Sequence, residues 1–377
     1  MSSAPLAGAP VPVTLFTGYL GAGKTTLLNR LLHDADSAGI VVIVNEFGEV
    51  GLDHLLIEQA EDNVVLLESG CLCCTIRGSL VETIQDLWLR EEAGTLAPIS
   101  RFVIETSGLA DPAPILQMLI AHPLMQARLR LDGVVCLVDA INGTHTLKHH
   151  SESARQVALA DRLILSKTDL LGDASDLAPL TSILRQLNPG APLVLTSDPE
   201  VLTHLTNLGL YDSSRGAANL PRWLHQAEDH PQPDAHHHHP HDHDHHDHSH
   251  THGVESFVLR HPDPIPAAVF DGFLDLLRST KGPNLLRLKG VVCLTEHPDR
   301  PVVVHGVQQV LHPPVKLPDW PTADRSSRLV FITHDCPKAV VERLFGAFVG
   351  QVQPDTADAD AMLDNPLAIS GFKPDQS

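Results

Sequence analysis

The strongest indication of how this chain folds is a glycine-rich loop of pattern G-x-x-x-x-G-K-T, Gly18-Tyr19-Leu20-Gly21-Ala22-Gly23-Lys24-Thr25. The apolar run Val11–Thr17 before it predicts a buried strand, and the amphipathic stretch Thr25–Leu32 after it predicts a helix. Glycines let backbone N–H groups wrap around a phosphate, and a helix amino terminus adds a favourable potential there. Strand, loop and helix together predict a nucleotide-binding phosphate loop that extends to Thr26.

Three side chains near this loop are the candidate catalytic residues. We expect Lys24 to neutralise the β- and γ-phosphates and the hydroxyl of Thr25 to bind Mg²⁺. The predicted strand Arg101–Thr106 supplies a carboxylate, Glu105, which we expect to hold the hydration shell of that ion. The backbone N–H of Gly108, just beyond this strand, is the expected contact to the γ-phosphate.

The tetrapeptide Ser166-Lys167-Thr168-Asp169, at the end of the predicted strand Arg162–Ser166, indicates which base is bound. The carboxylate of Asp169 can accept hydrogen bonds from N1–H and N2–H₂ of guanine, whereas adenine presents a lone pair at N1. This favours GTP over ATP. GTPases usually carry N-K-x-D here, and because Ser166 reaches less far than asparagine, we expect a weaker affinity for the base.

Short apolar runs alternate with amphipathic stretches over roughly the first 200 residues, and this alternation predicts an α/β fold. We expect a P-loop GTPase domain with a mainly parallel sheet at residues 11–212. Further predicted strands are Ile40–Val44, Val64–Leu67 and Val134–Asp139. Further predicted helices are Leu80–Leu89, Ile115–Ile120 and Leu177–Leu187.

The composition changes after this domain. Residues 213–253 lack apolar periodicity and include the tract His236–His252, so they form a predicted His-rich linker. Neutral imidazoles bind transition metals, and we expect the tract to raise the local metal concentration; a polar spacer without a metal role is the alternative.

A smaller C-terminal α+β domain is predicted at residues 254–350, followed by a tail at 351–377 that we expect to be disordered. The apolar pattern places Ile265, Val269, Phe273 and Leu276 on one face of a helix. The predicted strands are Val254–Arg260, Leu285–Leu294, Val302–Val307 and Arg328–Thr333, with a closing helix at Ala339–Phe348.

Three cysteines within four residues, Cys71, Cys73 and Cys74, indicate a metal site. Neighbouring cysteines lack the geometry for a relaxed disulfide, whereas thiolates at this spacing can converge on one Zn²⁺. Three local ligands leave a position for an outside group, for which Glu49 is our candidate. Further candidates are Glu46, His54 and His122. Zn²⁺ is the expected metal, with Co²⁺ or Ni²⁺ as alternatives.

Charge and composition exclude several functions. The formal net charge is -20, which argues against nucleic acid or an anionic membrane as the main partner. No apolar run approaches the ~20 residues of a membrane span, and we find no secretory signal, so we expect a cytoplasmic location. Cys136 and Cys293 lie within apolar strands and are predicted core residues.

With these motifs in this order, the chain resembles the CobW family of metal-handling P-loop GTPases, in particular its zinc-regulated GTPase metalloprotein activator branch. The matching blocks are G-Y-L-G-A-G-K-T-T-L-L-N-R, N-E-F-G-E-V-G-L-D, S-G-C-L-C-C-T-I-R-G, E-T-S-G-L-A-D-P and S-K-T-D-L. The segments Leu285–Gly290 and Val302–Val307 look like that family's carboxy-terminal domain. The resemblance implies a GTPase whose C-x-C-C site binds Zn²⁺ or Co²⁺ and passes it to a client protein.

We therefore predict a GTP-hydrolysing metallochaperone that acts on a metal-dependent client protein. A homodimer is a possible assembly, and we expect neither nucleic acid nor a membrane as a partner. Because Cys71–Cys74 lie between two predicted switch segments, Asn45–Asp53 and Glu105–Gly108, we expect hydrolysis to release the metal. Two alternatives stay open, cobalt delivery for cobalamin biosynthesis and a passive His-rich metal buffer.

Overall fold

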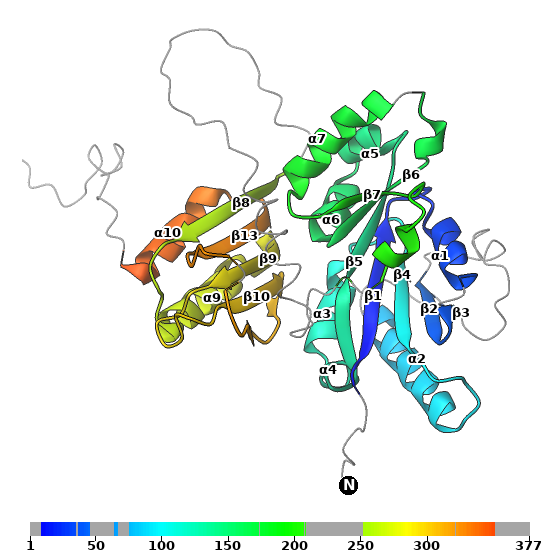
Figure 1. The fold of residues 1–377 in the computed structure, drawn as a ribbon, viewed down its shortest axis with the longest axis horizontal. Helices are drawn as coiled ribbons and strands as arrows, with labels where there is room; N and C mark the ends of the chain where they lie inside the picture. The colour runs from blue at the N-terminus through cyan, green and yellow to red at the C-terminus, as the bar shows by residue number, and fades with distance from the viewer. Residues whose placement is uncertain are drawn as a thin grey trace, which may run out of the picture.

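The computed structural model describes residues 9–34, 37–45, 64–66, 75–172, 174–206, 208, 252–320 and 322–350. Within these residues the chain forms a parallel sheet and an antiparallel sheet, on the right and left of Figure 1 respectively. The predicted tail and all of the predicted linker before His252 lie outside the described residues. Among the described helices, none has the length and hydropathy that crossing a membrane requires.

The N-terminal part is built on a parallel sheet with the order β3-β2-β4-β1-β5-β6-β7 in the described residues. Its strands are β1 (Val11–Gly18), β2 (Ile40–Asn45), β3 (Val64–Leu66), β4 (Arg101–Thr106), β5 (Leu129–Asp139), β6 (Arg162–Ser166) and β7 (Leu193–Leu195). The predicted α/β fold is confirmed, and β1 lies at the centre of the sheet. Because all strands are parallel, their carboxyl ends share one edge.

Strand β5 begins at Leu129 rather than at the predicted Val134, and β7 was not predicted. The charged Asp132 and the glycine at 133 interrupt the apolar pattern, so the start of β5 was missed. Asp132 is buried there because Arg101 of β4 donates to its carboxylate at 2.5 Å. The same guanidinium nitrogen donates to Thr14 of β1 at 2.9 Å, so one ion pair joins three neighbouring strands.

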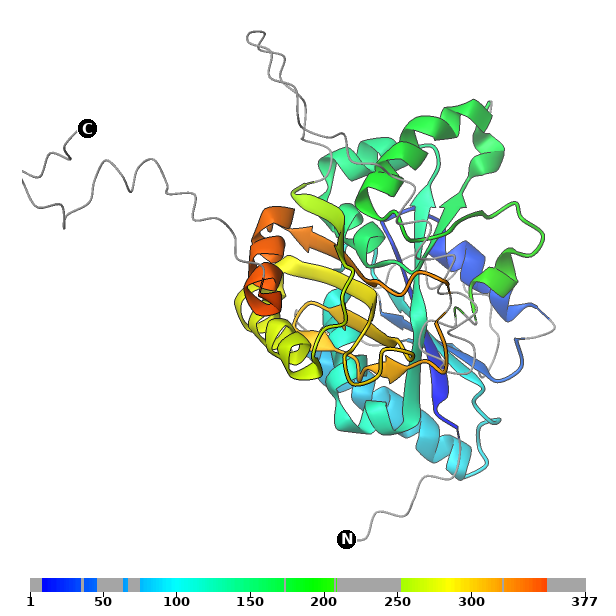
Figure 2. The same cartoon turned by 60° about the vertical axis from the view of Figure 1, so that its left-hand side comes forward.

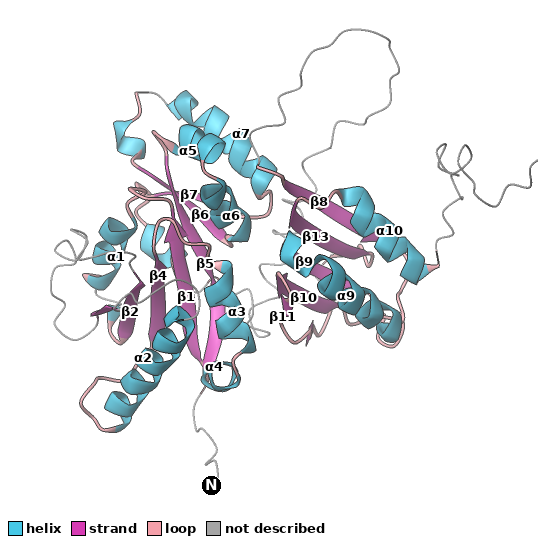
Figure 3. Cartoon of the chain, turned by 180° about the vertical axis from the view of Figure 1, so that it is seen from behind, coloured by secondary structure: helices cyan, strands magenta, loops and turns pink. Residues whose placement is uncertain are grey.

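Helices cover both faces of the parallel sheet, as parallel strands require. They are α1 (Lys24–Leu32), α2 (Thr75–Glu92), α3 (Ala113–Ala121), α4 (Pro123–Arg128), α5 (Gly143–His149), α6 (Ser151–Leu159) and α7 (Ala178–Leu187). Alternate strand residues face opposite layers: Leu15 packs in the core with α2, α3, α6 and α7, whereas Phe16 packs in the core with α1. Figure 3 shows α2 and α3 in front of the sheet.

Helices α5 and α6 were not predicted. The sequence of α6, SESARQVAL, opens with polar residues, and its buried positions include the small Ala154 and the polar Gln156, so an apolar stripe is hard to see. The helix forms because the sheet covers these positions, which is a tertiary effect that overrides weak local preference.

The C-terminal part is an antiparallel sheet with the order β11-β10-β9-β13-β8, to which β12 adds by pairing with β10. Its elements are β8 (Val254–His261), α9 (Ala267–Lys281), β9 (Leu285–Val292), β10 (Val302–Val307), β11 (Val310–Leu311), β12 (Val315–Lys316), β13 (Ser327–His334) and α10 (Lys338–Val349). Helices α9 and α10 cover one face. The other face packs on the N-terminal part, where Leu286 and Ile332 join the core of the parallel sheet. Figure 2 shows this C-terminal sheet brought forward.

The predicted helical face in this domain was wrong at two of its four residues, Ile265 and Leu276, whereas Val269 and Phe273 pack on the C-terminal core. Pro266 caps α9, so Ile265 lies before the helix and forms a β-bridge with Leu294. The helix buries Phe270, Phe273, Leu274 and Leu277, whereas Leu276 is 36% exposed. The stripe is therefore rotated from the predicted one and shares only Phe273 with it as a buried residue.

Candidate functional site

The carboxyl end of β1 turns into the phosphate loop, and only glycine fits where the turn begins. At Gly18, φ is 142° and an added Cβ would lie 2.4 Å from the carbonyl oxygen of Leu137. Gly21 and Gly23 have φ of 73° and 88°, which glycine adopts without strain. The loop ends at the amino terminus of α1, so the predicted strand–loop–helix context is confirmed. A helix amino terminus of this kind favours an anion such as phosphate.

The side chains of the loop lie as follows. Lys24 is buried, and its Nζ donates to the carbonyl oxygen of Gly18 at 2.9 Å. This hydrogen bond connects the last part of the phosphate loop to its first residue, so the ammonium group lies inside the loop. Ala22 N donates to the carbonyl oxygen of Tyr19 at 3.1 Å. Thr25 is partly exposed on the first turn of α1 and Thr26 is exposed, while Leu20 at the tip is 51% exposed.

Strand β4 brings its residues directly to this loop. It neighbours β1 with Glu105 opposite Phe16, and Glu105 is 2% exposed. A Cβ added to Gly108 would lie 2.7 Å from the backbone nitrogen of Leu20, so the turn after β4 packs against the phosphate loop and needs glycine. Glu105 and Gly108 are therefore at the edge of the sheet where the sequence predicted them.

Strand β6 ends beside the same loop through a contact that the sequence did not reveal. The hydroxyl of Ser166 donates to the carbonyl oxygen of Ala22 at 2.7 Å and lies 3.3 Å from that of Val138. Lys167 follows with φ of 58°, and the exposed Asp169 lies on a short 3₁₀ turn, Thr168–Leu170. The predicted base-selecting residues Lys167 and Asp169 thus directly follow Ser166, whose side chain is hydrogen-bonded to the phosphate loop.

Asp139, at the carboxyl end of β5, is a site residue that we did not predict. Its carboxylate accepts from Lys167 Nζ at 2.7 Å and from the backbone N–H groups of Ile141 and Asn142. Burial raises the pKa of Asp139, but these hydrogen bonds outweigh it and hold the pKa below its ordinary value. The signal was present, because a carboxylate ended a predicted strand beside the one that carries the base motif.

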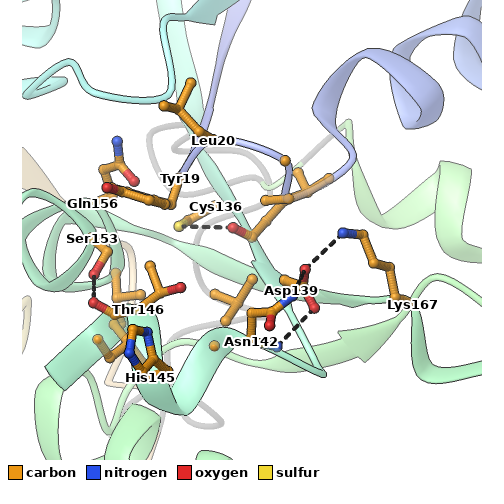
Figure 4. A pocket seen from close by; sticks show the side chains of 17 residues that line it. Tyr19, Leu20, Cys136, Asp139, Asn142, His145, Thr146, Ser153, Gln156 and Lys167 are labelled. Atoms are coloured by element: carbon orange, nitrogen blue, oxygen red, sulfur yellow. Dashed lines mark hydrogen bonds and ion pairs between the residues drawn. The ribbon is translucent and has the colours of Figure 1, made fainter. Parts of the chain in front are cut away.

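A cavity of about 300 Å³ opens beside the phosphate loop (Figure 4). Tyr19 from the loop, Asp139 and Asn142 after β5, and His145 and Gln156 from α5 and α6 are among the residues that line it. Tyr19 stacks on His150, with ring centroids 4.6 Å apart, which holds the loop against the turn between α5 and α6.

The predicted metal ligands Cys71, Cys73, Cys74 and Glu49 lie outside the described residues, as do Glu46 and His54. In the part of the chain that the structure describes, no group of three or more His, Cys, Asp or Glu could hold a metal ion. Cys136 and Cys293 are buried core residues, as predicted. Burial raises the pKa of Cys136 to about 12 despite the opposing charge of Lys24, so this thiol stays protonated and does not offer a thiolate.

A parallel sheet whose central strand feeds a glycine-rich loop and helix defines a P-loop nucleotide-binding protein. Residues 12–195 match the family described as "CobW/HypB/UreG, nucleotide-binding domain", and residues 254–349 match "Cobalamin synthesis protein cobW C-terminal domain". The chain belongs to the CobW family. The family resemblance predicted from the sequence is confirmed.

Relatives match over nearly the whole chain. It is 31% identical to "Zinc chaperone YjiA" of Escherichia coli strain K12, over 90% of this chain and 98% of that one. It is 32% identical to "Zinc chaperone CobW" of Pseudomonas aeruginosa, over 88% of this chain and 90% of that one. A crystal structure of Zn(II)-bound YjiA GTPase from E. coli superimposes with a TM-score of 0.62 at 26% identity, covering 90% of this chain and 99% of that one.

Proposed function

We propose that this chain is a GTP-hydrolysing metallochaperone that binds zinc at Cys71, Cys73 and Cys74 with Glu49, and delivers it to a client protein. The observation that carries the nucleotide part is the bond from Ser166 to Ala22, which joins the base-selecting segment to the phosphate loop. Membership of a family whose relatives are named zinc chaperones supports the metal part.

The roles of the nucleotide-binding residues follow from their positions. Lys24 already donates to a backbone carbonyl inside the loop, and phosphate oxygens would replace this neutral acceptor with a charged one. Gly108, packed against Leu20, offers its N–H to the γ-phosphate. Asp169 accepts from N1–H and N2–H₂ of guanine, and Lys167 is held beside it by Asp139.

The residues at the ends of β4 and the phosphate loop fit Mg²⁺. The Thr25 hydroxyl and the Glu105 carboxylate offer hard oxygen ligands, the kind that Mg²⁺ prefers. Thr106, next to Glu105, donates from Oγ1 to Thr17 Oγ1 at 2.9 Å, which holds the end of β4 against β1. When bound there, Mg²⁺ would neutralise negative charge on the phosphates.

The strand ends support coupling between the nucleotide and the metal. β2 ends at Asn45 and β3 ends at Leu66, and both carboxyl ends lie at the edge of the sheet that carries the phosphate loop. In the sequence, Glu49 follows the first of these ends and Cys71 follows the second. We infer that loss of the γ-phosphate changes the ligand set and releases zinc, as in other nucleotide switches.

The test is zinc affinity, measured by chelator competition with a non-hydrolysable GTP analogue, with GDP, and without nucleotide. We expect the analogue state to bind zinc at least tenfold more tightly than the GDP state, and Cys73→Ser to abolish that tight binding. Cys293→Ala, which removes a buried cysteine of the C-terminal sheet, is the matched control and should bind zinc normally.

Other outcomes identify the alternatives. Equal zinc affinity in all three nucleotide states would contradict coupling and leave a passive metal buffer. The same titration with Co²⁺ tests cobalt delivery, which would be favoured if only Co²⁺ affinity responded to the nucleotide.

A further inference from the structure

Gln156 lies in α6, on the wall of the cavity beside the phosphate loop, and is fully buried (Figure 4). Its Nε2 donates to the carbonyl oxygens of Gly108 and Ala110, each at 3.1 Å. Both donors of one side-chain amide are thus directed to the turn that follows β4. This turn contains the backbone N–H that our proposed function assigns to the γ-phosphate.

The orientation of this amide is set by its partners. Only the NH₂ end can donate to two carbonyl oxygens, so the opposite assignment would place oxygen against oxygen. Among the described residues, Oε1 has no hydrogen-bond partner. No protein donor in the described part of the chain therefore competes to turn the amide away from Gly108.

The turn is held from both sides. On one side the backbone of Gly108 lies against Leu20 of the phosphate loop, so closely that a Cβ would not fit. On the other side Gln156 holds its carbonyl oxygen. The position of Gly108 relative to the phosphates therefore depends on where α6 places this side chain.

Helix α6 is itself fixed at its carboxyl end. Asn188 Nδ2 donates to the carbonyl oxygens of Val157 and Ala160, each at 2.8 Å. Arg287 of the C-terminal sheet donates to the carbonyl oxygen of Leu159. A polar group that acts on a reaction needs such a rigid support, because small displacements weaken it strongly.

We propose that Gln156 is a positioning residue for GTP hydrolysis, which holds the Gly108 turn in the geometry that contacts the γ-phosphate. This role rests on the proposed function, in which Gly108 senses that phosphate. Because GDP has no γ-phosphate, the contribution of Gln156 is specific to the triphosphate state and to turnover.

The test compares Gln156→Met with Asn284→Leu. Each substitution replaces a side-chain amide that donates to a backbone carbonyl by an apolar side chain of similar size, but Asn284 donates to His334 in the C-terminal domain, and only Gln156 contacts the Gly108 turn. We expect Gln156→Met to lower kcat for GTP and the affinity for a non-hydrolysable GTP analogue by roughly tenfold or more, while GDP affinity changes less than twofold. Asn284→Leu should leave kcat and the ratio of analogue to GDP affinity unchanged.

GDP binding by Gln156→Met also shows that the variant is folded. If that variant does not fold, Gln156→Asn, which withdraws the amide by one methylene and perturbs packing less, should be used. Its kcat and analogue affinity should fall in the same way, but by a smaller factor. Wild-type kcat and a wild-type affinity ratio in whichever variant folds would overturn the role of Gln156 alone. A wild-type chain that hydrolyses no GTP would instead overturn the proposed function, and the role of Gln156 with it.

Discussion

Ser166 stands where GTPases usually carry asparagine, and its position shows what the shorter side chain does. Its hydroxyl reaches the carbonyl oxygen of Ala22, so it fastens β6 to the phosphate loop. A buried hydrogen bond of this kind contributes about 1 kcal/mol. Ser166 therefore stabilises the phosphate loop. This loop is expected to contact phosphates that are present in both GTP and GDP.

Replacement of Ser166 by alanine should lower the affinities for GTP and GDP to a similar extent, by roughly fivefold, because the bond to the loop is lost. Isothermal titration with both nucleotides measures this effect. Ser100→Ala is the matched control, since Ser100 Oγ donates to the carbonyl oxygen of Ala38 on an exposed turn away from the loop. Unchanged affinities in Ser166→Ala would show that the bond does not hold the loop.

Asp169 acts on the base instead. Asp169→Asn should weaken GTP binding by ~2–3 kcal/mol, the size of a charge-assisted hydrogen bond, and should improve binding of xanthosine triphosphate, whose C2 carbonyl accepts from the new amide. Competition titration with the two nucleotides measures the switch. Asp299→Asn, at an exposed ion pair of the C-terminal domain, should leave both affinities alone. Retention of full GTP affinity by Asp169→Asn would refute the assignment.

At the scale of elements, the β10–β11 hairpin carries two histidines that resist protonation. His305 is buried on β10, and its carbonyl oxygen accepts from the backbone N–H of His312 at 2.9 Å. Burial lowers the pKa of His312 to about 4, with Arg287 lowering it further and Asp161 opposing. Burial also holds the pKa of His305 well below its ordinary value, and the charge of Lys289 adds to this effect.

These shifts predict acid sensitivity. In the unfolded chain both imidazoles bind protons near pH ~6.5. The free energy of unfolding should therefore be at its maximum above that pH and should fall as the pH drops toward 4. For His312 alone we expect a loss of about 1 kcal/mol between pH 7.5 and 5.5, measured by urea denaturation. His312→Asn should reduce this slope, whereas His297→Asn, at an exposed histidine, should keep it. An unchanged slope in His312→Asn would contradict the prediction.

At the scale of the whole molecule, a buried charge cluster joins the two domains. Asp161, the residue before β6, accepts from Arg287 and Lys289 of β9 and from the backbone N–H of Val134. Burial raises the pKa of Asp161, but the two cations outweigh it and hold the pKa below its ordinary value. Burial lowers the pKa of Lys289 to about 8, with Arg287 adding to the effect and Asp161 opposing it. Two buried cations therefore share the Asp161 carboxylate.

This imbalance predicts unequal costs for two substitutions. Asp161→Asn removes the negative charge that the two buried cations share and should lower the free energy of unfolding by ~3–5 kcal/mol. Lys289→Met leaves the Asp161–Arg287 pair intact and should cost about 1 kcal/mol or less. Chemical denaturation measures both. Asp275→Asn, at the exposed pair with Arg278, is the control and should change stability little. Equal costs for Asp161→Asn and Lys289→Met would show that the cluster is not held by its carboxylate.

The parallel fold, the phosphate loop, the family, and the position of Glu105 and Gly108 at the edge of the sheet could all be predicted from the sequence. Each of these rests on contiguous residues, because a buried parallel strand, a glycine turn and the first turn of a helix are specified by neighbours along the chain. The same local reasoning failed where polar residues are buried: it shortened β5 at Asp132 and missed α6 around Gln156.

The contacts of several polar residues could be seen only in the folded chain. The bonds from Ser166 to Ala22, from Gln156 to Gly108 and from Arg287 to Asp161 join residues that lie far apart in the sequence. The residue type at these positions does not indicate which distant residue the side chain will bond to. A polar group gains a specific role only when the fold buries it, since burial makes an unmade hydrogen bond costly and so fixes the one that forms.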